Sequence, residues 1–183
     1  LIIYFLVISL LLFNCKQKPA TDVKPKELPR ISKNEHLLMA TLWQQKAAEY
    51  RALAYQAFNI AKKRIDEDSK INRGKKNAII VDIDETVLDN SPFQATNITA
   101  DRDYPQGWDA WCNKAIAKEV PGAIDCLKYA VSKGYDVFYI SNRKVKLLEG
   151  TMKNLQDMGF PQANEEHILL RGEIKSKEPR REK

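Results

Sequence analysis

The sequence is poor in cysteine, glycine and histidine. It has 3 Cys, 7 Gly and 2 His among 183 residues. Three cysteines are too few for a disulfide framework, and two isolated histidines, His36 and His167, do not make a metal site. The low glycine content, with 8 prolines and no internal repeat, excludes a collagen-like or low-complexity chain. The fold must therefore be held by a hydrophobic core, for which roughly 150 residues are sufficient.

Positive charge is also scarce in the central part of the chain, although the formal net charge is +6. Residues 15–34 hold six Lys or Arg against two acids, and residues 171–183 hold six against three, so residues 35–170 carry a net charge of −1. A protein that binds nucleic acid needs basic residues gathered on one folded face. No helix with interleaved arginines occurs between the two basic stretches, and we therefore expect no nucleic-acid partner.

The first 14 residues, LIIYFLVISLLLFN, are apolar except for Ser9 and Asn14. As a helix they would span about 21 Å, which is shorter than the roughly 30 Å hydrocarbon core of a membrane. This pattern is typical of the apolar region of a signal peptide. Cys15 follows at once and resembles the lipidated cysteine of a bacterial lipoprotein, although it could also be incidental. The absence of a starting Met and of a basic leader suggests that the sequence is clipped here.

Residues 15–34 contain three of the eight prolines and few large apolar side chains. This composition predicts an extended linker between a lipidated Cys15 and the folded domain. A lipid on Cys15 would anchor the protein to a membrane without a spanning helix. We therefore expect a location in the bacterial cell envelope, at the outer membrane.

Residues 35–183 alternate helix and strand signals and are expected to form one domain. Between His36 and Asp68, apolar residues recur every three or four positions, which predicts one long helix. The continuous apolar run at 78–81 is typical of a strand buried in a parallel sheet. The order predicted after this first strand is helix 107–118, helix 121–133, strand 135–140, helix 144–158 and strand 167–170. This βαβαβ order implies an α/β fold with a parallel sheet and right-handed crossovers.

Two carboxylates follow the first predicted strand, at Asp82 and Asp84. On an extended chain their side chains point to the same side and Ile83 points away. Two neighbouring carboxylates repel each other unless a hard divalent cation or a shared proton offsets the repulsion, and Mg²⁺ suits them best. A solvated acidic turn is the alternative. The EF-hand pattern is excluded, because Val87 and Phe93 occupy the positions that it requires to be Gly and Glu, and the chain has no Walker loop.

Residues 80–93, IVDIDETVLDNSPF, are similar to the first motif of the class C acid phosphatases. These are haloacid dehalogenase-like enzymes, often surface lipoproteins with 5′-nucleotidase activity. The family usually has Tyr where this chain has Phe93. The resemblance implies a haloacid dehalogenase-like Rossmannoid parallel sheet with flanking helices and a small cap insert. It continues in family order through 108–111 (WDAW), 120–123 (VPGA), 139–143 (YISNR) and 176–180 (SKEPR).

Chemistry and resemblance imply the same catalytic roles. Asp82 would attack phosphorus to form an aspartyl-phosphate, and Asp84 would act as general acid and then as general base. Both would belong to the Mg²⁺ site, Asp84 through its backbone carbonyl. Ser141 would donate a hydrogen bond to a phosphoryl oxygen, and Lys177 would neutralise negative charge. The alternatives are a helix cap for Ser141 and a solvated surface lysine for Lys177.

The resemblance places Trp108 and Phe93 at the substrate pocket. Trp108 and Trp111 are three residues apart and could instead pack in the core. Cys112 and Cys126 could pair in an oxidising compartment, but their separation does not follow from the sequence, and we treat them as free thiols.

The final acidic motif of the family, which supplies further metal ligands, does not occur before Lys183. We expect a chain truncated at its carboxyl end rather than an inactive relative. The sequence thus predicts a lipid-anchored, Mg²⁺-dependent phosphomonoesterase acting on small esters, most simply nucleoside 5′-monophosphates. The alternatives are a ligand-binding envelope lipoprotein on the same fold and an intracellular phosphotransferase. The oligomeric state stays open.

Overall fold

The computed structural model describes residues 33–71 and 74–182. The expected signal peptide at 1–14, Cys15 and most of the linker at 15–34 lie outside the described residues. Within the described part of the chain, no helix combines the length and the apolar character needed to cross a membrane.

The helical region at the start of the domain is broken, whereas the sequence predicted one helix over 36–68. A short 3-10 helix, η1 (Glu35–Leu37), leads into α2 (Leu38–Lys46), and α3 (Ala48–Asp68) follows. The break lies at Ala47, whose backbone is extended, with φ −73° and ψ 131°. The single-helix prediction was wrong because α2 packs on the later helix α4 (Ser91–Thr99), whereas α3 packs on α6 (Ala123–Ser132). Apolar periodicity continues across Ala47 and does not reveal this change of direction.

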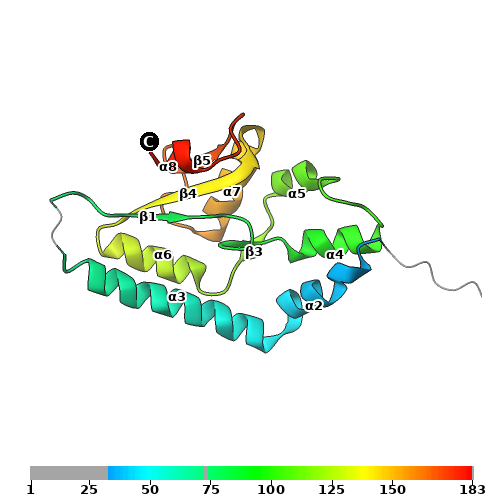
Figure 1. Ribbon diagram of the computed structural model, residues 1–183, viewed down its shortest axis with the longest axis horizontal. Coiled ribbons are helices and arrows are strands. Elements are labelled where there is room, and N and C mark those ends of the chain that lie inside the picture. Colours follow the sequence, from blue (N-terminus) through cyan, green and yellow to red (C-terminus); the bar gives the residue numbers. More distant parts are fainter. Residues whose placement is uncertain (1–32, 72–73, 183) are drawn as a thin grey trace, which may run out of the picture. The chain divides into compact units, whose positions relative to one another are not determined.

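Three parallel strands form the sheet, in the order β1 (Ala78–Val81), β4 (Asp136–Lys144) and β5 (Ile168–Arg171). Val81 of β1 lies in register with Tyr139 of β4. The predicted α/β fold with a parallel sheet is confirmed. The middle strand continues to Lys144, four residues beyond its predicted end, and Figure 1 shows it between the other two.

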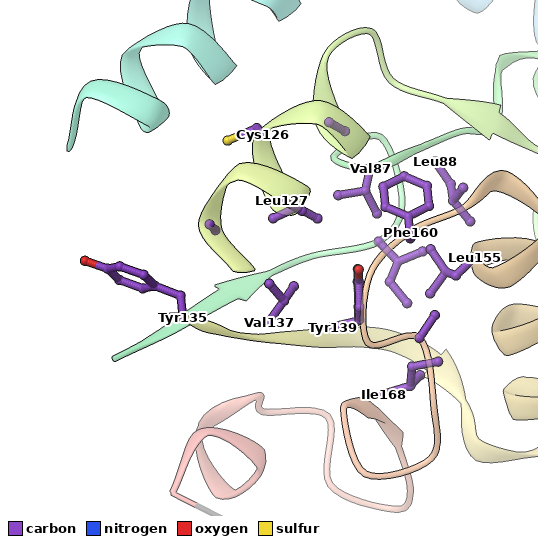
Figure 2. Packing of buried hydrophobic residues seen from close by; sticks show 14 of the residues in the cluster. Val87, Leu88, Cys126, Leu127, Tyr135, Val137, Tyr139, Leu155, Phe160 and Ile168 are labelled. Carbon is purple, nitrogen blue, oxygen red and sulfur yellow. The ribbon is translucent and has the colours of Figure 1, made fainter. Parts of the chain in front are cut away.

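The core lies between one face of the sheet and two helices. Val137 and Tyr139 are two residues apart on β4, so their side chains share a face, and both are fully buried. They belong to one cluster with Leu127 of α6 and Leu155 of α7 (Leu148–Met158), as Figure 2 shows. Helix α6 therefore lies between the sheet and α3 (Figure 1). This packing fixes the carboxyl ends of β1 and β4, where the polar residues lie.

A small insert separates β1 from α6. It contains β2 (Leu88–Asp89), α4, α5 (Trp108–Lys114) and β3 (Lys118–Glu119), and β2 pairs with β3 in antiparallel register. Helix α4 falls in a stretch for which the sequence predicted no regular structure. Its first turn contains a proline, which lacks a backbone N–H. Proline is tolerated there because a backbone N–H in the first turn would have no acceptor within the helix. The remaining elements are η2 (Val145–Leu147), which precedes α7, and α8 (Glu178–Arg181).

Candidate active site

The acidic turn after β1 is folded tightly around a buried residue. Ile83 is fully buried, and its carbonyl oxygen accepts hydrogen bonds from the backbone N–H groups of Val87 and Leu88, at 3.0 and 2.9 Å. Asp82 and Asp84, on either side of Ile83, remain partly exposed. The predicted alternation is therefore present, and it turns two carboxylates away from the core at the carboxyl end of β1. The strand itself is less buried than the sequence predicted, because it lies at the edge of the described sheet and Ile80 is 49% exposed.

Asp82 forms an ion pair with Lys177. The Lys177 Nζ atom lies 2.5 Å from Oδ2 of Asp82, and the Asp82 side chain is 41% exposed. The other carboxylate oxygen, Oδ1, accepts a hydrogen bond from the backbone N–H of Ile83 at 2.8 Å. Lys177 immediately precedes α8 and is mostly buried, so it is not the solvated surface lysine considered from the sequence. The structure thus brings together two predicted site residues that are 95 positions apart in the chain.

The carboxylate of Asp84 is held by three side chains. Its Oδ1 atom accepts hydrogen bonds from Nδ2 of Asn90 at 2.9 Å and from Nε and Nη2 of Arg143 at 3.0 and 2.8 Å. Its Oδ2 atom accepts one from Oγ of Ser141 at 3.2 Å. Ser141 is fully buried and does not cap the following helices, which have no side-chain cap hydrogen bond at their N-termini. Its hydroxyl contacts Asp84, and its hydrogen bond to a phosphoryl oxygen stays a prediction.

A register shift in β4 directs these side chains. Ile140 of β4 pairs with Leu169 of β5, but the next pair is Lys144 with Arg171. Four steps along β4 therefore match only two along β5, so two extra residues are accommodated between Ile140 and Lys144. Irregularities of this kind re-aim side chains next to functional sites. Here the shifted segment carries both Ser141 and Arg143. Sequence reasoning missed the shift because strand pairing is not local.

Arg143 is a site residue that sequence reasoning missed. Its side chain is 1% exposed and forms an ion pair with Asp84. Its Nη1 atom donates to Oγ1 of Thr151 at 3.2 Å, and its Cζ atom lies 5.4 Å from the ring centroid of Trp108. The sequence held one sign of this role, because Arg143 follows closely on the predicted strand 135–140. An arginine buried beside such a strand needs an acidic partner. Arg143 connects Asp84 with an aromatic residue of the insert.

Arg180 is the second residue missed. It is 9% exposed, and its guanidinium donates hydrogen bonds to the backbone carbonyl of Ser141, to Oδ1 of Asn142 at 2.8 Å and to the backbone carbonyl of Ser176 at 3.0 Å. Burial lowers the pKa of this guanidinium below its ordinary value. Arg180 ties the loop that carries Lys177 to the end of β4, so it supports the ion pair of Lys177 with Asp82.

Aromatic side chains of the insert stand beside Arg143. Trp108 is half-buried, lies edge-on to Phe93 with 5.0 Å between the ring centroids, and lines a cavity of about 370 Å³. Phe93, expected at the substrate pocket, is 3% exposed and does not line this cavity. Trp111 donates from Nε1 to Oδ1 of Asn90 at 2.8 Å. Phe93, in the first turn of α4, is therefore buried inside the insert, where its ring packs against the ring of Trp108.

The oxygen donors of the acidic turn fit Mg²⁺. No group of three or more His, Cys, Asp or Glu side chains among residues 33–71 and 74–182 could hold an ion. The family resemblance assigns the metal to the carboxylate of Asp82, which is 41% exposed and paired with Lys177, and to the backbone carbonyl of Asp84. Mg²⁺ is commonly bound by one or two protein oxygens, with water molecules and a substrate phosphate completing its shell. Such a set suits a hard cation and not a soft one.

The two cysteines of the folded part are free and buried. Burial raises the pKa of the Cys112 thiol to about 12 and raises that of Cys126 as well. Both thiols are therefore protonated at neutral pH. The expectation that the two cysteines are free is confirmed.

Comparison with known proteins adds to this geometry. The sequence model of the family described as "HAD superfamily, subfamily IIIB (Acid phosphatase)" matches residues 14–183. The structure is similar to the crystal structure of a class C acid phosphatase from Bacillus anthracis with tungstate bound, with 50% identity, a TM-score of 0.81 and coverage of 83% of this chain. A second structure of the class C acid phosphatase from Bacillus anthracis gives 51% identity, a TM-score of 0.79 and coverage of 81%. The chain spans 65% and 63% of the lengths of these two relatives.

Proposed function

The chain belongs to the acid phosphatases of HAD subfamily IIIB, and from this membership we propose that it hydrolyses phosphomonoesters through an aspartyl-phosphate on Asp82. The observation that supports this most is the pairing of Lys177 Nζ with Asp82 Oδ2 at 2.5 Å, beside an Asp84 that Ser141 and Arg143 hold in place. A nucleophilic carboxylate needs a neighbouring cation, because it must approach a negatively charged phosphoryl group.

In the first half of the reaction, an oxygen of Asp82 attacks phosphorus. The bond between phosphorus and the ester oxygen breaks, and a bond between phosphorus and the Asp82 oxygen forms. A protonated Asp84 gives its proton to the departing oxygen, so an alcohol leaves and Asp84 becomes a carboxylate. Lys177 stabilises the negative charge on the transferring group. The Ser141 hydroxyl, which donates its one proton to Asp84 in the structure, would redirect it to a phosphoryl oxygen.

In the second half, the Asp84 carboxylate takes a proton from a water molecule while that water attacks the phosphorus. The bond from phosphorus to Asp82 then breaks and inorganic phosphate leaves, which restores both aspartates. The Asp82 carboxylate and the Asp84 carbonyl would hold Mg²⁺, which would supply positive charge to offset the negative charge of the nucleophile and the phosphoryl group. The hydrogen bonds from Arg143 keep the Asp84 carboxylate oriented through both halves.

We further propose that the substrate is a small ester with an aromatic leaving group, such as a nucleoside 5′-monophosphate. The half-buried Trp108 and the exposed Tyr104 line the cavity, and their ring centroids lie 5.8 Å apart. A planar base can stack on such rings. The tungstate of the Bacillus anthracis enzyme is a tetrahedral oxyanion, so tungstate is a suitable probe for a phosphoryl position here.

We propose in addition that the protein is a lipoprotein of the bacterial cell envelope, anchored through Cys15 to the outer membrane. The support is the sequence alone, in which an apolar stretch at 1–14 precedes Cys15 and a proline-containing linker follows it.

The test is hydrolysis of p-nitrophenyl phosphate with Mg²⁺ present, by the protein and by its Asp82→Asn variant. The amide cannot form an acyl phosphate, so we expect turnover to fall roughly 1,000-fold or more. Chelation should stop the reaction and Mg²⁺ should restore it. Asp157→Asn, on the exposed end of α7, is the matched control and should retain normal turnover.

Two results would overturn the proposal. Near-normal turnover by Asp82→Asn would exclude the covalent mechanism. Tungstate binding without hydrolysis of any ester, in a protein that also carries the family's final acidic motif, would support the ligand-binding lipoprotein that the sequence left as an alternative.

A further inference from the structure

Two cations face the cavity beside Trp108 from neighbouring strands. Lys144, the last residue of β4, pairs in register with Arg171, the last residue of β5, and both line the cavity of about 370 Å³. Like charges on neighbouring strands repel each other. Within residues 33–71 and 74–182, neither side chain has a carboxylate within ion-pairing distance to relieve this repulsion. An anion in the cavity would relieve it.

The other polar groups of the cavity leave its charge positive. Asp109 lines it as well, but its carboxylate is paired with Lys146. Asn142 has its Oδ1 atom held by Arg180, so the amide nitrogen, a hydrogen-bond donor, is the end of the side chain left for a ligand. Asn142, Lys144 and Arg171, called the donor wall below, therefore contribute hydrogen-bond donors to the same cavity that the aromatic rings of Trp108 and Tyr104 line.

The donor wall is separate from the reaction centre. None of Asp82, Asp84 and Lys177 lines this cavity. The two sites are joined through the end of β4, where Ser141 contacts Asp84 and the next residue, Asn142, lines the cavity. Arg143 also bridges them, since it binds Asp84 and lies against Trp108. A substrate whose phosphoryl group lies at Asp82 would extend its leaving group into the cavity.

We propose that this cavity binds a second anionic group on the leaving-group side of the substrate, so that the preferred substrates are phosphomonoesters carrying a further phosphate or carboxylate. A nucleoside 3′,5′-bisphosphate has the required parts: one phosphate for Asp82, a base for the aromatic rings and a second phosphate for Lys144 and Arg171. This inference rests on the proposed function, because the position of the reacting phosphate is taken from it.

The experiment compares p-nitrophenyl phosphate, adenosine 5′-monophosphate and adenosine 3′,5′-bisphosphate as substrates of the protein and of its Lys144→Met and Arg171→Met variants. For the wild type, KM should be lowest for the bisphosphate. Each substitution should raise that KM roughly 10-fold, since a hydrogen bond to a charged group is lost. Turnover of p-nitrophenyl phosphate should stay within about twofold. Lys153→Met, on the exposed side of α7, is the matched control.

A binding measurement keeps the two proposals distinguishable. Asp82→Asn protein, which cannot turn over, is titrated calorimetrically with the monophosphate and the bisphosphate at low and high salt. Tighter binding of the bisphosphate, lost in Lys144→Met and weakened by salt, supports the inference even if hydrolysis is absent. Equal affinity for the two nucleotides overturns it. If Lys144→Met and Arg171→Met lower kcat/KM equally for p-nitrophenyl phosphate and for the bisphosphate, the inference is also overturned. Both cations would then contact the reacting phosphate.

Discussion

Arg143 donates two hydrogen bonds to one oxygen of Asp84, from Nε at 3.0 Å and from Nη2 at 2.8 Å. The guanidinium is a rigid fork, so this arrangement fixes both the position and the plane of the carboxylate. Asn90 donates to the same oxygen and Ser141 to the other. The residue proposed to move protons is therefore oriented before any substrate arrives.

Arg143→Lys keeps the charge but loses the fork, so we expect kcat to fall about 10- to 100-fold with a smaller change in KM. Arg143→Met should also lower the free energy of unfolding by about 2–3 kcal/mol, because it leaves a partly buried Asp84 without its cation. Steady-state kinetics and urea unfolding measure the two effects. A normal kcat for Arg143→Lys would show that orientation by Arg143 is not needed.

Arg180 and Arg181 are neighbours with different surroundings. Arg180 is buried against the end of β4, whereas Arg181 pairs with the exposed Glu178. We expect Arg180→Met to lower kcat about 10-fold or more, since the loop carrying Lys177 loses its attachment. Arg181→Met should have little effect, as exposed ion pairs contribute little. Tungstate affinity, measured on both variants, should fall only for Arg180→Met. Equal behaviour of the two variants would contradict this role.

Gly150 lies where α7 crosses close to α5. A Cβ atom at this position would lie 2.8 Å from the carbonyl oxygen of Cys112 and 2.9 Å from Cα of Asn113, and these backbone atoms cannot turn aside. Gly150→Ala should therefore lower the free energy of unfolding by about 1–2 kcal/mol, despite the better helix propensity of alanine. It should also shift the fluorescence of Trp108 in α5. Gly172→Ala, which has open space around it, is the control in the same urea titration.

Cys112 should make stability fall at alkaline pH. Burial raises its pKa to about 12, whereas an unfolded thiol titrates near pH 8.5. The contribution of the Cys112 thiol to the free energy of unfolding is fully present below about pH 8.5. It is lost between about pH 8.5 and about pH 12, because in this range only the unfolded chain releases the thiol proton. In this range the free energy of unfolding should fall by about 1.4 kcal/mol per pH unit because of this one thiol. Urea midpoints from pH 8 to pH 10 should fall less steeply for Cys112→Ala than for the wild type. Parallel slopes would exclude this assignment.

Cys15→Ser should move the protein from the membrane fraction to the soluble fraction. Cleavage before Cys15 would remove the apolar residues 1–14, so attached lipid would be the only anchor, and two or three acyl chains hold stably where one does not. Lys16→Gln should leave the membrane association unchanged. Retention of a cleaved Cys15→Ser protein in the membrane would contradict the lipoprotein proposal.

The features that the sequence predicted correctly are those that depend on local patterns. The apolar run before Asp82 identified β1, and the alternation around Ile83 identified the two carboxylates. The pairing of Lys177 with Asp82 was expected only because a family resemblance placed both residues in one site.

The features that the sequence did not predict depend on contacts between distant segments. The break at Ala47 arises because α2 and α3 pack on different helices. The register shift of β4 depends on its pairing with β5, and without it the role of Arg143 cannot be deduced. Phe93 was expected to contact substrate, but the path of the insert buries it. The pattern of apolar and polar residues along the chain does not predict the helix break, the register shift or the burial of Phe93.

The register of Val81 with Tyr139 joins the turn that carries Asp82 to the central strand of the sheet. The strand β1, which ends just before Asp82, is hydrogen-bonded directly to β4, which carries Ser141, and β4 has partners on both sides. Amide protons in such a central strand exchange with solvent mainly when the whole unit opens, whereas those of surface segments exchange through local fluctuations. We therefore expect the backbone just before Asp82 and the β4 backbone beside it to separate only when the sheet itself opens.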